Sequence, residues 1–350
     1  METTTKMKNK VLIVYTGGTI GMVQDENGAL IPFPLNHIYD LVPELKNCTY
    51  RIDTCQLENI IDSSNMTPSQ WVDIAECIER EYDNYDGFVV LHGTDTMAYT
   101  ASALSFMFEN LSKPIILTGS QLPMGMLRSD GRENLICALE LAAGKEQVIP
   151  EVCLYFENHL YRGNRSTKVS SEFFDAFSSY NYPALVKAGI SFTYRPHLVL
   201  LPSSEPMRVH KHFDRHIAVL KIFPGITPEV VEAVLHTEHL RGVVLETFGS
   251  GNAPTKEWFI DAIEDAIRRG IVVLNVTQCK AGAVKMYQYE AGVGMQRIGV
   301  VGGNDITPEA AVTKLMFLLG MYPDDPGAVK SALQQSLRGE ITVTPTVINH

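Results

Sequence analysis

The stretch KVLIVYTGGT, residues 10–19, holds the transition on which the interpretation of the whole sequence depends. A run of mostly apolar residues, typical of a buried strand, ends at Gly17 and Gly18, and a threonine hydroxyl follows at once. The start of this pattern resembles a phosphate-binding loop, but no Gly-Lys-Ser/Thr follows. The turn therefore presents the hydroxyl of Thr19, and the function of this hydroxyl has to be inferred from the other segments of the sequence.

Strand-like apolar runs alternate with helix-like segments along most of the chain. One helix is predicted to start after Thr67, because Pro68 suits the first helical position and Gln70 completes a capping box. The β-α-β-α order predicts a parallel sheet covered by helices on both faces. The expected strands are residues 10–15, 87–91, 114–117, 152–156, 216–223, 243–248 and 271–276, and the other expected helices are 97–111, 129–143, 228–236, 256–269, 307–319 and 326–337.

Residues 195–215 interrupt this rhythm. The stretch contains three prolines and several histidines with weak periodicity, which is typical of a linker. The length of 350 residues also fits two domains. We therefore expect an α/β protein with a larger N-terminal parallel-sheet domain, catalytic, over residues 1–194, a linker over 195–215 and a smaller C-terminal α/β domain over 216–350.

Composition excludes several classes of protein. The formal net charge of -11 argues against a nucleic-acid partner and against binding to a membrane of anionic lipid. The polar start METTTKMKNK lacks the apolar core of a secretory signal, and no apolar run is long enough to span a bilayer. The six scattered cysteines include no C-x-x-C pair, so neither a disulfide framework nor a zinc site is indicated. A cytoplasmic protein is expected.

Polar side chains gather in the segments that follow the predicted strands, where ligands of open parallel sheets bind. These segments contain many hydroxyls, one carboxylate that could face a ligand and one lysine. Neither a histidine-based triad nor a metal-ligand spacing is evident in them. The segments are GGT at 17–19, DSSN at 62–65, HGTDT at 92–96, TGS at 118–120 and RGNRSTK at 162–168.

This set of groups suits acyl transfer from a small polar substrate. A hydroxyl can attack a carbonyl if a base takes its proton, and a buried lysine has its pKa lowered by desolvation so that it can serve as that base. A neighbouring aspartate can orient the lysine or bind a substrate ammonium. Gly17 and Gly18 allow close approach of the backbone and leave N–H groups free to stabilise an oxyanion.

Taken singly, each residue also has an ordinary structural explanation. Thr19 and Asp95 could cap helices, Ser63 and Ser64 could be loop residues, and Lys168 could be a solvated charge. The functional interpretation therefore depends on the combination.

A histidine cluster could suggest a metal site, and one cysteine could suggest a nucleophile. His210, His212 and His216 have a metal-like spacing, but they lie in the expected linker without a carboxylate or cysteine arrangement, so no metal is predicted there. Cys279 has no nearby histidine in sequence and is not expected to be a nucleophile.

Two segments, TGGTIG at 16–21 and LHGTDTMAYTASALSFM at 91–107, closely resemble the two signatures of the L-asparaginase/glutaminase family. The likeness is greatest to the cytoplasmic type I bacterial enzymes, covers most of the chain and is weakest over residues 195–215. The paired signatures are far more specific than a lone glycine-rich turn. Further matching segments are ILTGSQLP at 116–123, LRSDGRENL at 127–135, LYRGNRSTK at 160–168, FFDAFSS at 173–179, FGSGNAP at 248–254, GIVVLNVTQC at 270–279 and GVVGGNDITPEA at 299–310.

The resemblance implies hydrolysis of L-asparagine to L-aspartate and ammonia by a homodimer or homotetramer, without metal or organic cofactor. It implies that Thr19 is the nucleophile in a double displacement and that Thr94 is the second catalytic threonine. Asp95 is expected to bind the substrate α-ammonium, and Lys168 to pair with Asp95 and Thr94. Which threonine attacks first stays open.

The resemblance also implies a substrate-binding set. Asp62, Ser63 and Ser64 align with the loop that receives the substrate α-carboxylate. Ser120 falls where a backbone carbonyl meets the side-chain amide, and Gly18 brings the backbone to the substrate.

The segment after the first signature, MVQDENGALIPFP at 22–34, departs from the family pattern. Family members usually place there a tyrosine that bonds the nucleophile, whereas Ala29 or Leu30 stands near that place here and the next tyrosine is Tyr39. Either a tyrosine comes from elsewhere, or the first threonine is activated differently. This segment is expected to be a lid that moves in the absence of substrate.

A second departure concerns regulation. Some type I enzymes bind asparagine at a second site in the smaller domain, and Asn252, Thr277 and Cys279 match residues of that possible effector site. Glu246 stands where those enzymes use an arginine. Because a carboxylate repels the carboxylate of an amino acid, we expect weak or absent cooperativity.

Two other functions share the signatures. An asparaginase-like amidotransferase subunit supplies ammonia to a partner enzyme but carries an extra N-terminal domain, for which residues 1–9 leave no room. A non-enzymatic amino-acid-binding protein would not be expected to keep Thr19, Thr94, Asp95 and Lys168 together.

Overall fold

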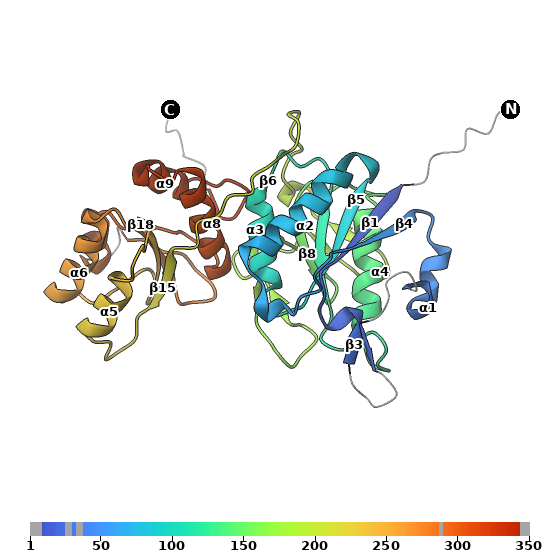
Figure 1. Cartoon of the computed structure of the whole chain (residues 1–350), viewed down its shortest axis with the longest axis horizontal. Coiled ribbons are helices and arrows are strands. Elements are labelled where there is room, and N and C mark those ends of the chain that lie inside the picture. The colour runs from blue at the N-terminus through green and yellow to red at the C-terminus, as the bar shows by residue number, and fades with distance from the viewer. Residues whose placement is uncertain (1–8, 25–29, 33–37, 287–289, 344–350) are drawn as a thin grey trace. The chain divides into compact units, whose positions relative to one another are not determined.

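The protein, described by a computed structural model over residues 9–24, 30–32, 38–286 and 290–343, forms two compact units. They comprise residues 1–211 and 212–350, so the division falls inside the stretch 195–215. Each unit has its own sheet with flanking helices (Figure 1). Among the described helices, none combines the length and apolarity that crossing a membrane requires.

An eight-stranded sheet forms the centre of the first unit, in the order β13-β12-β9-β8-β7-β5-β1-β4. The stretch from β4 to β8 is parallel, as predicted, and Figure 1 shows β8, β5, β1 and β4 running from the middle of the unit toward α1. Every residue of β5, β7 and β8 is buried and most are apolar, which is the pattern of strands covered on both faces. These strands are β1 (Lys10–Tyr15), β4 (Arg51–Gln56), β5 (Gly87–Leu91), β7 (Ile115–Thr118) and β8 (Val152–Phe156).

The other end of this sheet is antiparallel, which the sequence analysis did not predict. β9 (His159–Arg162) turns back against β8, and β12 (Val186–Lys187) and β13 (Thr193–Tyr194) follow it. The sequence analysis treated residues 162–168 as one segment after a predicted strand, but Arg162 ends β9 and Lys168 lies on β10 (Thr167–Lys168). Strands of two residues contain too little alternation for a sequence pattern to reveal them.

Helices cover both faces of the first sheet. Val11, Ile13 and Tyr15 pack in one core cluster with Leu135 and Leu139 of α4 (Gly131–Ala142). α2 (Pro68–Glu81) and α3 (Met97–Met107) lie together on the opposite side of the sheet (Figure 1). The predicted capping box at the start of α2 is confirmed, and in it the Thr67 amide donates a hydrogen bond of 2.8 Å to Gln70 Oε1.

α3 is shorter than predicted. It is buried nearly all round, which is typical of a helix inside the core. The helix ends because Phe108 takes up an extended conformation and starts β6 (Phe108–Glu109), which pairs with β14 (Arg208–Val209).

Short elements complete the first unit and carry most of the polar segments named above. They are η1 (Thr19–Gly21), β2 (Met22–Gln24), β3 (Leu30–Pro32), α1 (Ile38–Leu41), η3 (Pro43–Asn47), η4 (Ser63–Asn65), η5 (Tyr82–Asn84), η6 (Gly163–Arg165), β11 (Phe177–Ser178) and η7 (Pro196–Leu198).

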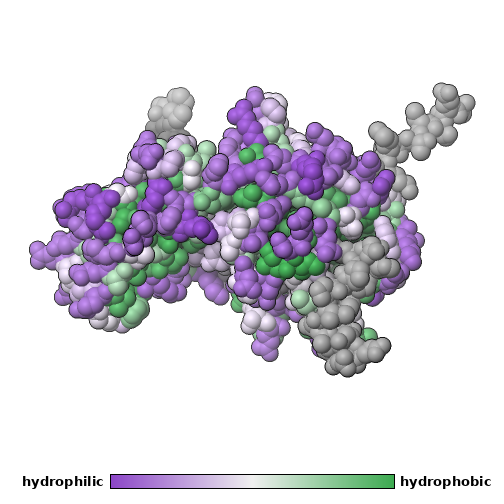
Figure 2. All heavy atoms as spheres, viewed as in Figure 1, coloured by the Kyte–Doolittle hydropathy of each residue, from purple (hydrophilic) through white to green (hydrophobic). Residues whose placement is uncertain are grey.

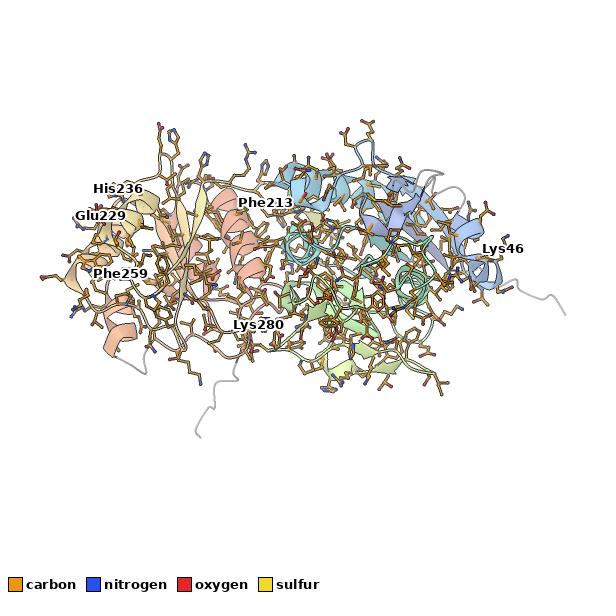
Figure 3. All side chains as sticks on the ribbon, turned by 90° about the horizontal axis from the view of Figure 1, so that it is seen from below. Lys46, Phe213, Glu229, His236, Phe259 and Lys280 are labelled. Carbon is orange, nitrogen blue, oxygen red and sulfur yellow. The ribbon has the colours of Figure 1, made fainter. Side chains whose placement is uncertain are left out.

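The second unit is built on a parallel sheet in the order β15-β16-β17-β18. Phe259 on α6 is fully buried in its core together with Leu245 and Val273 (Figure 3). The strands are β15 (Ile217–Lys221), β16 (Gly242–Thr247), β17 (Val272–Thr277) and β18 (Val301–Gly302), and the helices are α5 (Pro228–Leu235), α6 (Glu257–Arg268), α7 (Glu290–Arg297), α8 (Pro308–Met321) and α9 (Pro326–Leu333).

Candidate active site

The turns after β1 and β5 meet at the carboxyl edge of the first sheet. The two strands are parallel neighbours, with Tyr15 opposite Leu91, so the turns that follow them start side by side. The backbone of Gly18, at a φ of +89°, lies against that of Gly93, and a Cβ atom on Gly18 would overlap it. Only glycine permits this approach, so the turn sequence is a condition for bringing the two signatures together.

The loop 62–65 joins the same junction. The Ile61 amide donates a hydrogen bond of 2.9 Å to the Thr16 carbonyl. The Thr96 hydroxyl donates one of 2.7 Å to the carbonyl of Ser63, whose side chain packs against Gly93. Three segments far apart in the sequence therefore form one polar surface.

Within this loop, the side chain of Asp62 is engaged with its own backbone. It accepts a hydrogen bond of 3.0 Å from the Ser64 amide, and this bond lowers the pKa of the carboxyl group below its usual value. The carboxylate thus caps η4. Ser64 is exposed and Ser63 is buried.

Lys168 links the second signature to a distant part of the chain. Its ammonium donates hydrogen bonds of 2.8 Å to the Thr94 hydroxyl and 2.7 Å to Asp95 Oδ1, across 74 and 73 positions of sequence. The pairing of β10 with β11 sets Lys168 opposite Phe177. The lysine side chain is 18% exposed, whereas that of Asp95 is 65% exposed, so the carboxylate keeps a face open to a ligand.

These contacts indicate how Lys168 can act on Thr94. An ammonium that donates to a hydroxyl stabilises negative charge that develops on the oxygen. The Thr94 hydroxyl in turn donates a hydrogen bond of 3.3 Å to Gln121 Oε1. The arrangement therefore gives Thr94 both a cation beside its oxygen and an acceptor for its proton.

Gln121 is a site residue that the sequence analysis missed. Its backbone amide donates to Asp130 Oδ2 at 3.0 Å, and its side-chain amide donates to the Phe173 carbonyl at 3.1 Å. The neighbouring Ser120 is buried and its hydroxyl donates to the Leu122 carbonyl at 2.6 Å. The segment SQLP in the matching stretch 116–123 was the available signal for Gln121.

His92 lies beside this cluster but has a structural role. It is completely buried, and its ring nitrogens contact the Gly93 carbonyl at 2.7 Å and the Thr100 hydroxyl at 2.9 Å. Burial lowers the pKa of His92 to about 4, so the ring is neutral near pH 7.

Thr19 starts η1 directly after Gly18 and is half-buried. Tyr15 lies beneath this turn, where its hydroxyl donates to the Gly21 carbonyl at 3.2 Å and burial raises its pKa to about 12. Tyr15 is thus a tyrosine next to η1, but it comes from β1 and not from the lid segment, and its hydroxyl bonds the Gly21 carbonyl.

The expected lid is described only in part. β2 and β3, at its two ends, pair as an antiparallel ribbon in which Met22 lies opposite Pro32. Ala29 and the side chain of Leu30 lie outside the described residues, so the expected lid motion stays a prediction.

In the second unit, the matched effector residues surround the turn after β16. The Thr277 hydroxyl donates to the Gly249 carbonyl at 2.6 Å and accepts from the Cys279 amide at 3.0 Å. Asn252 closes the same turn by a backbone bond to Phe248. Glu246, on β16, pairs with Lys221 at 3.3 Å.

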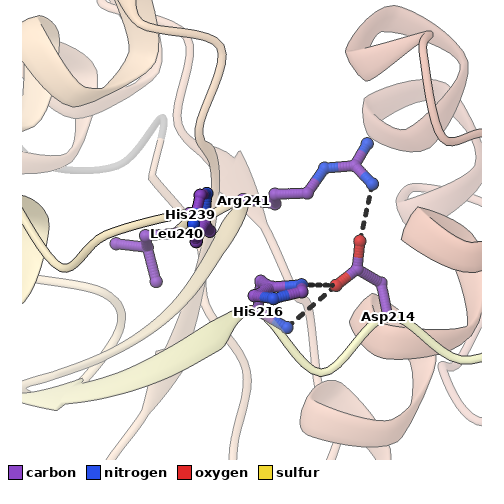
Figure 4. A pocket seen from close by; sticks show the side chains of 5 residues that line it. All are labelled: Asp214, His216, His239, Leu240 and Arg241. Carbon is purple, nitrogen blue, oxygen red and sulfur yellow. Dashed lines mark hydrogen bonds and ion pairs between the residues drawn. The ribbon is translucent and has the colours of Figure 1, made fainter.

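Two histidines of residues 210–216 have separate carboxylate partners. His210 pairs with Glu109 at 2.8 Å. His216 contacts Asp214 Oδ1 at 2.7 Å, in a pocket where Arg241 holds the other carboxylate oxygen (Figure 4). In the described ranges, no group of three or more His, Cys, Asp or Glu side chains has an arrangement that could hold a metal ion.

Comparison with known families identifies the chain. Residues 10–199 match the family model "Asparaginase, N-terminal", and residues 216–333 match "Glutaminase/Asparaginase C-terminal domain". The chain belongs to the asparaginase family. This confirms the resemblance seen in the two signatures, together with the expected fold class.

Individual asparaginase-family relatives span almost the whole chain. L-asparaginase 1 of Escherichia coli K12 is 46% identical over 96% of this chain and 98% of its own length. The 60 kDa lysophospholipase of Mus musculus is 42% identical over 97% of this chain and 64% of its own length. The crystal structure of L-asparaginase I from Vibrio cholerae superposes with a TM-score of 0.88 at 43% identity, covering 96% of this chain and all of that one.

The contact between Gly18 and Gly93 makes a testable prediction about stability. Gly18→Ala should lower the free energy of unfolding by at least ~3 kcal/mol, because left-handed strain and backbone overlap act together. Gly144→Ala, at a φ of +59° with only the Val148 side chain nearby, should cost about 1–2 kcal/mol. Urea titration of both variants measures the difference, and equal losses would contradict the proposed role of the contact.

Proposed function

We propose that this asparaginase-family chain hydrolyses L-asparagine to L-aspartate and ammonia. The observation that carries the proposal is the bonding of Lys168 to both Thr94 and Asp95, next to the turn that bears Thr19. Similarity to L-asparaginase 1 of Escherichia coli along almost the full length supports the substrate.

The proposed substrate-binding set follows from exposure and charge. The open face of Asp95 attracts the α-ammonium, while the loop of Asp62, Ser63 and Ser64 receives the α-carboxylate. Because the Asp62 carboxylate is turned to the Ser64 amide, the two serines rather than the acid are the groups that contact the carboxylate. We assign the side-chain amide to the backbone around Ser120 and Gly18.

In the first half of the reaction, the Thr19 oxygen attacks the side-chain amide carbon. The C–O bond forms, the hydroxyl proton passes to the amide nitrogen, and the negative charge on the carbonyl oxygen is stabilised by N–H groups of the glycine turn. Cleavage of the C–N bond releases ammonia and leaves an aspartyl ester on Thr19.

In the second half, water hydrolyses the ester and restores the threonine. The water oxygen bonds to the acyl carbon, the C–O bond to Thr19 breaks, and one water proton passes through the Thr94 hydroxyl, whose oxygen is held by the Lys168 ammonium, to the departing Thr19 oxygen. This geometry is compatible with an exchange of roles between the two threonines, and the proposal assigns the first attack to Thr19.

We further propose that the enzyme acts on free asparagine rather than as an ammonia-supplying amidotransferase subunit. The coverage of 98% of Escherichia coli L-asparaginase 1 favours the free enzyme. Ammonia release from free asparagine, without a partner protein or tRNA, distinguishes the two functions.

The assignment of Thr19 and Lys168 predicts the effect of removing each group. Thr19→Ala should lower kcat for asparagine by about 10³-fold or more, because it removes the attacking oxygen. Lys168→Met should lower kcat by about 10²–10⁴-fold, because it removes the cation beside Thr94. Steady-state ammonia release with asparagine and with glutamine measures both effects.

Matched controls come from the same unit. Thr193→Ala on β13 and Lys187→Met on β12 change exposed residues of the same type and should leave kcat unchanged. A loss of less than ~10-fold for Thr19→Ala, about 1.4 kcal/mol of barrier, would show that the nucleophile is wrongly assigned.

We propose weak or absent cooperativity with asparagine, because the Glu246–Lys221 pair occupies part of the matched effector region. The rate should rise hyperbolically with asparagine, with a Hill coefficient of about 1. Glu246→Gln, which removes the repelling charge, serves as the comparison. A strongly sigmoidal curve for the unmodified protein would overturn the proposal.

We also propose a cytoplasmic homodimer or homotetramer. All six cysteines are free thiols, which suits a reducing compartment. The visible surface is mainly hydrophilic (Figure 2), yet Leu127 is fully exposed and Phe173 is 65% exposed close to Gln121. Exposed apolar residues of this kind are typical of a contact with a second copy.

The oligomer proposal predicts that Leu127→Asp combined with Phe173→Asp lowers the mass in solution toward that of one chain. A charge placed in an apolar subunit contact is costly to bury. Light scattering after size-exclusion chromatography measures the mass. Val230→Asp, an exposed apolar position on α5, is the control, and a monomeric unmodified protein would contradict the proposal.

A further inference from the structure

Two cysteines outside the candidate active site lie in direct sulfur–sulfur contact. Cys55 is on β4, the edge strand of the first sheet, and Cys77 is on α2. Their Sγ atoms are 3.0 Å apart, although the residues are 22 positions apart in sequence. Cys55 is partly exposed and Cys77 is buried. A disulfide requires about 2.05 Å between the sulfurs, which is about 1 Å less than their present separation.

We propose that Cys55 and Cys77 are a reversible redox modification site, at which a peroxide or a glutathione-type disulfide oxidises the dithiol to an intrachain disulfide. The proposal concerns chemistry separate from amide hydrolysis and does not rest on the proposed function.

The surroundings assign a different role to each sulfur. Burial, followed by the bond to Cys55, raises the pKa of the Cys77 thiol to about 12, so this thiol is a poor first nucleophile. Cys55 is the more exposed of the two, and the Arg80 guanidinium lies 4.0 Å from its sulfur and 3.9 Å from that of Cys77. Cys55 therefore attacks the oxidant, and Cys77 resolves the product.

With oxidised glutathione, the Cys55 thiolate forms a mixed disulfide and releases one glutathione thiolate. Cys77 then attacks the Cys55 sulfur, the second glutathione leaves with the Cys77 proton, and the intrachain disulfide forms. With a peroxide, the Cys55 thiolate becomes a sulfenic acid and hydroxide is released. Attack by Cys77 then expels water. In both routes the dithiol loses two electrons and the oxidant gains them.

The disulfide would enclose the segment that carries residues 62–65. Between the two cysteines, the Leu57 amide donates to the Tyr15 carbonyl at 3.2 Å, the Ile61 amide donates to Thr16, and Ser63 packs on Gly93. Oxidation joins the strand before this segment to the helix after it. The disulfide would therefore reduce the conformational freedom of this segment in the unfolded chain. In the folded chain it would restrict movement at the two ends of the segment.

The other thiols have different surroundings. Cys153 is completely buried, and Cys137 donates to Glu133 at 3.4 Å. Cys279 is exposed in the second unit. An oxidant at low excess should accordingly react with the Cys55–Cys77 pair without consuming the buried thiols.

The test treats the reduced full chain with oxidised glutathione and follows free thiols, peptide mass and thermal unfolding. In the Cys279→Ser variant, which lacks the exposed thiol of the second unit, free thiols should fall from about five to about three per chain, with a tryptic peptide pair linked through Cys55 and Cys77. Dithiothreitol should restore both thiols. The unfolding midpoint of the oxidised form should rise by about 5 °C, because the cross-link reduces the entropy of the unfolded chain.

Single variants separate the two roles. Cys77→Ser should leave glutathione attached to Cys55, whereas Cys55→Ser should leave Cys77 unmodified. Cys279→Ser is the matched control and should still form the cross-link. Accumulation of a stable Cys55–glutathione adduct in the unmodified protein, or a linkage between other cysteines, would overturn the proposal. Loss of asparagine hydrolysis in any of these variants does not bear on it, because the readout is the linkage itself.

Discussion

The close approach of two backbone segments, at Gly18 and Gly93, is the constraint on which the rest of the site depends. β1 and β5 are hydrogen-bonded neighbours, so their carboxyl ends are already adjacent, but a side chain on Gly18 would hold the following turns apart. With the glycines in place, the threonine of one turn and the Thr94–Asp95 pair of the other lie at the same edge. The loop 62–65 then completes the surface through its contacts to Thr16 and Thr96.

Electrostatics then differentiate the groups at this edge. Lys168 and Asp95 are an ion pair, but because the carboxylate is largely exposed, the pair contributes little to folding stability. The ion pair positions the Lys168 ammonium, because the Asp95 carboxylate holds it where it also contacts the Thr94 oxygen. The neutral His92 nearby adds no competing charge, since its burial keeps the ring unprotonated.

The sequence predicts the buried strands, but it does not predict strands of a few residues or contacts between distant side chains. β1, β5 and β8 have the predicted bounds, because continuous apolar runs between turn residues leave few alternatives. β4 was missed because Ile52 and Cys55 are the only apolar residues in its sequence RIDTCQ, and β9, β12 and β13 because short edge strands carry little signal. The contact between Lys168 and Asp95 spans 73 positions, which no periodicity encodes, so it was expected only from the family resemblance. Gln121 was overlooked because a neutral amide in a turn has no distinctive spacing.

The edge position of β4 connects these observations. Among the described strands, only β1 is hydrogen-bonded to β4, and α2 contacts β4 through the sulfur of Cys77. The segment leaving β4 is fixed within a few residues to the carbonyls of Tyr15 and Thr16, next to the glycine turn. A covalent link between β4 and α2 would therefore act on both ends of the loop that we assign to the substrate carboxylate, while leaving Thr94, Asp95 and Lys168 untouched.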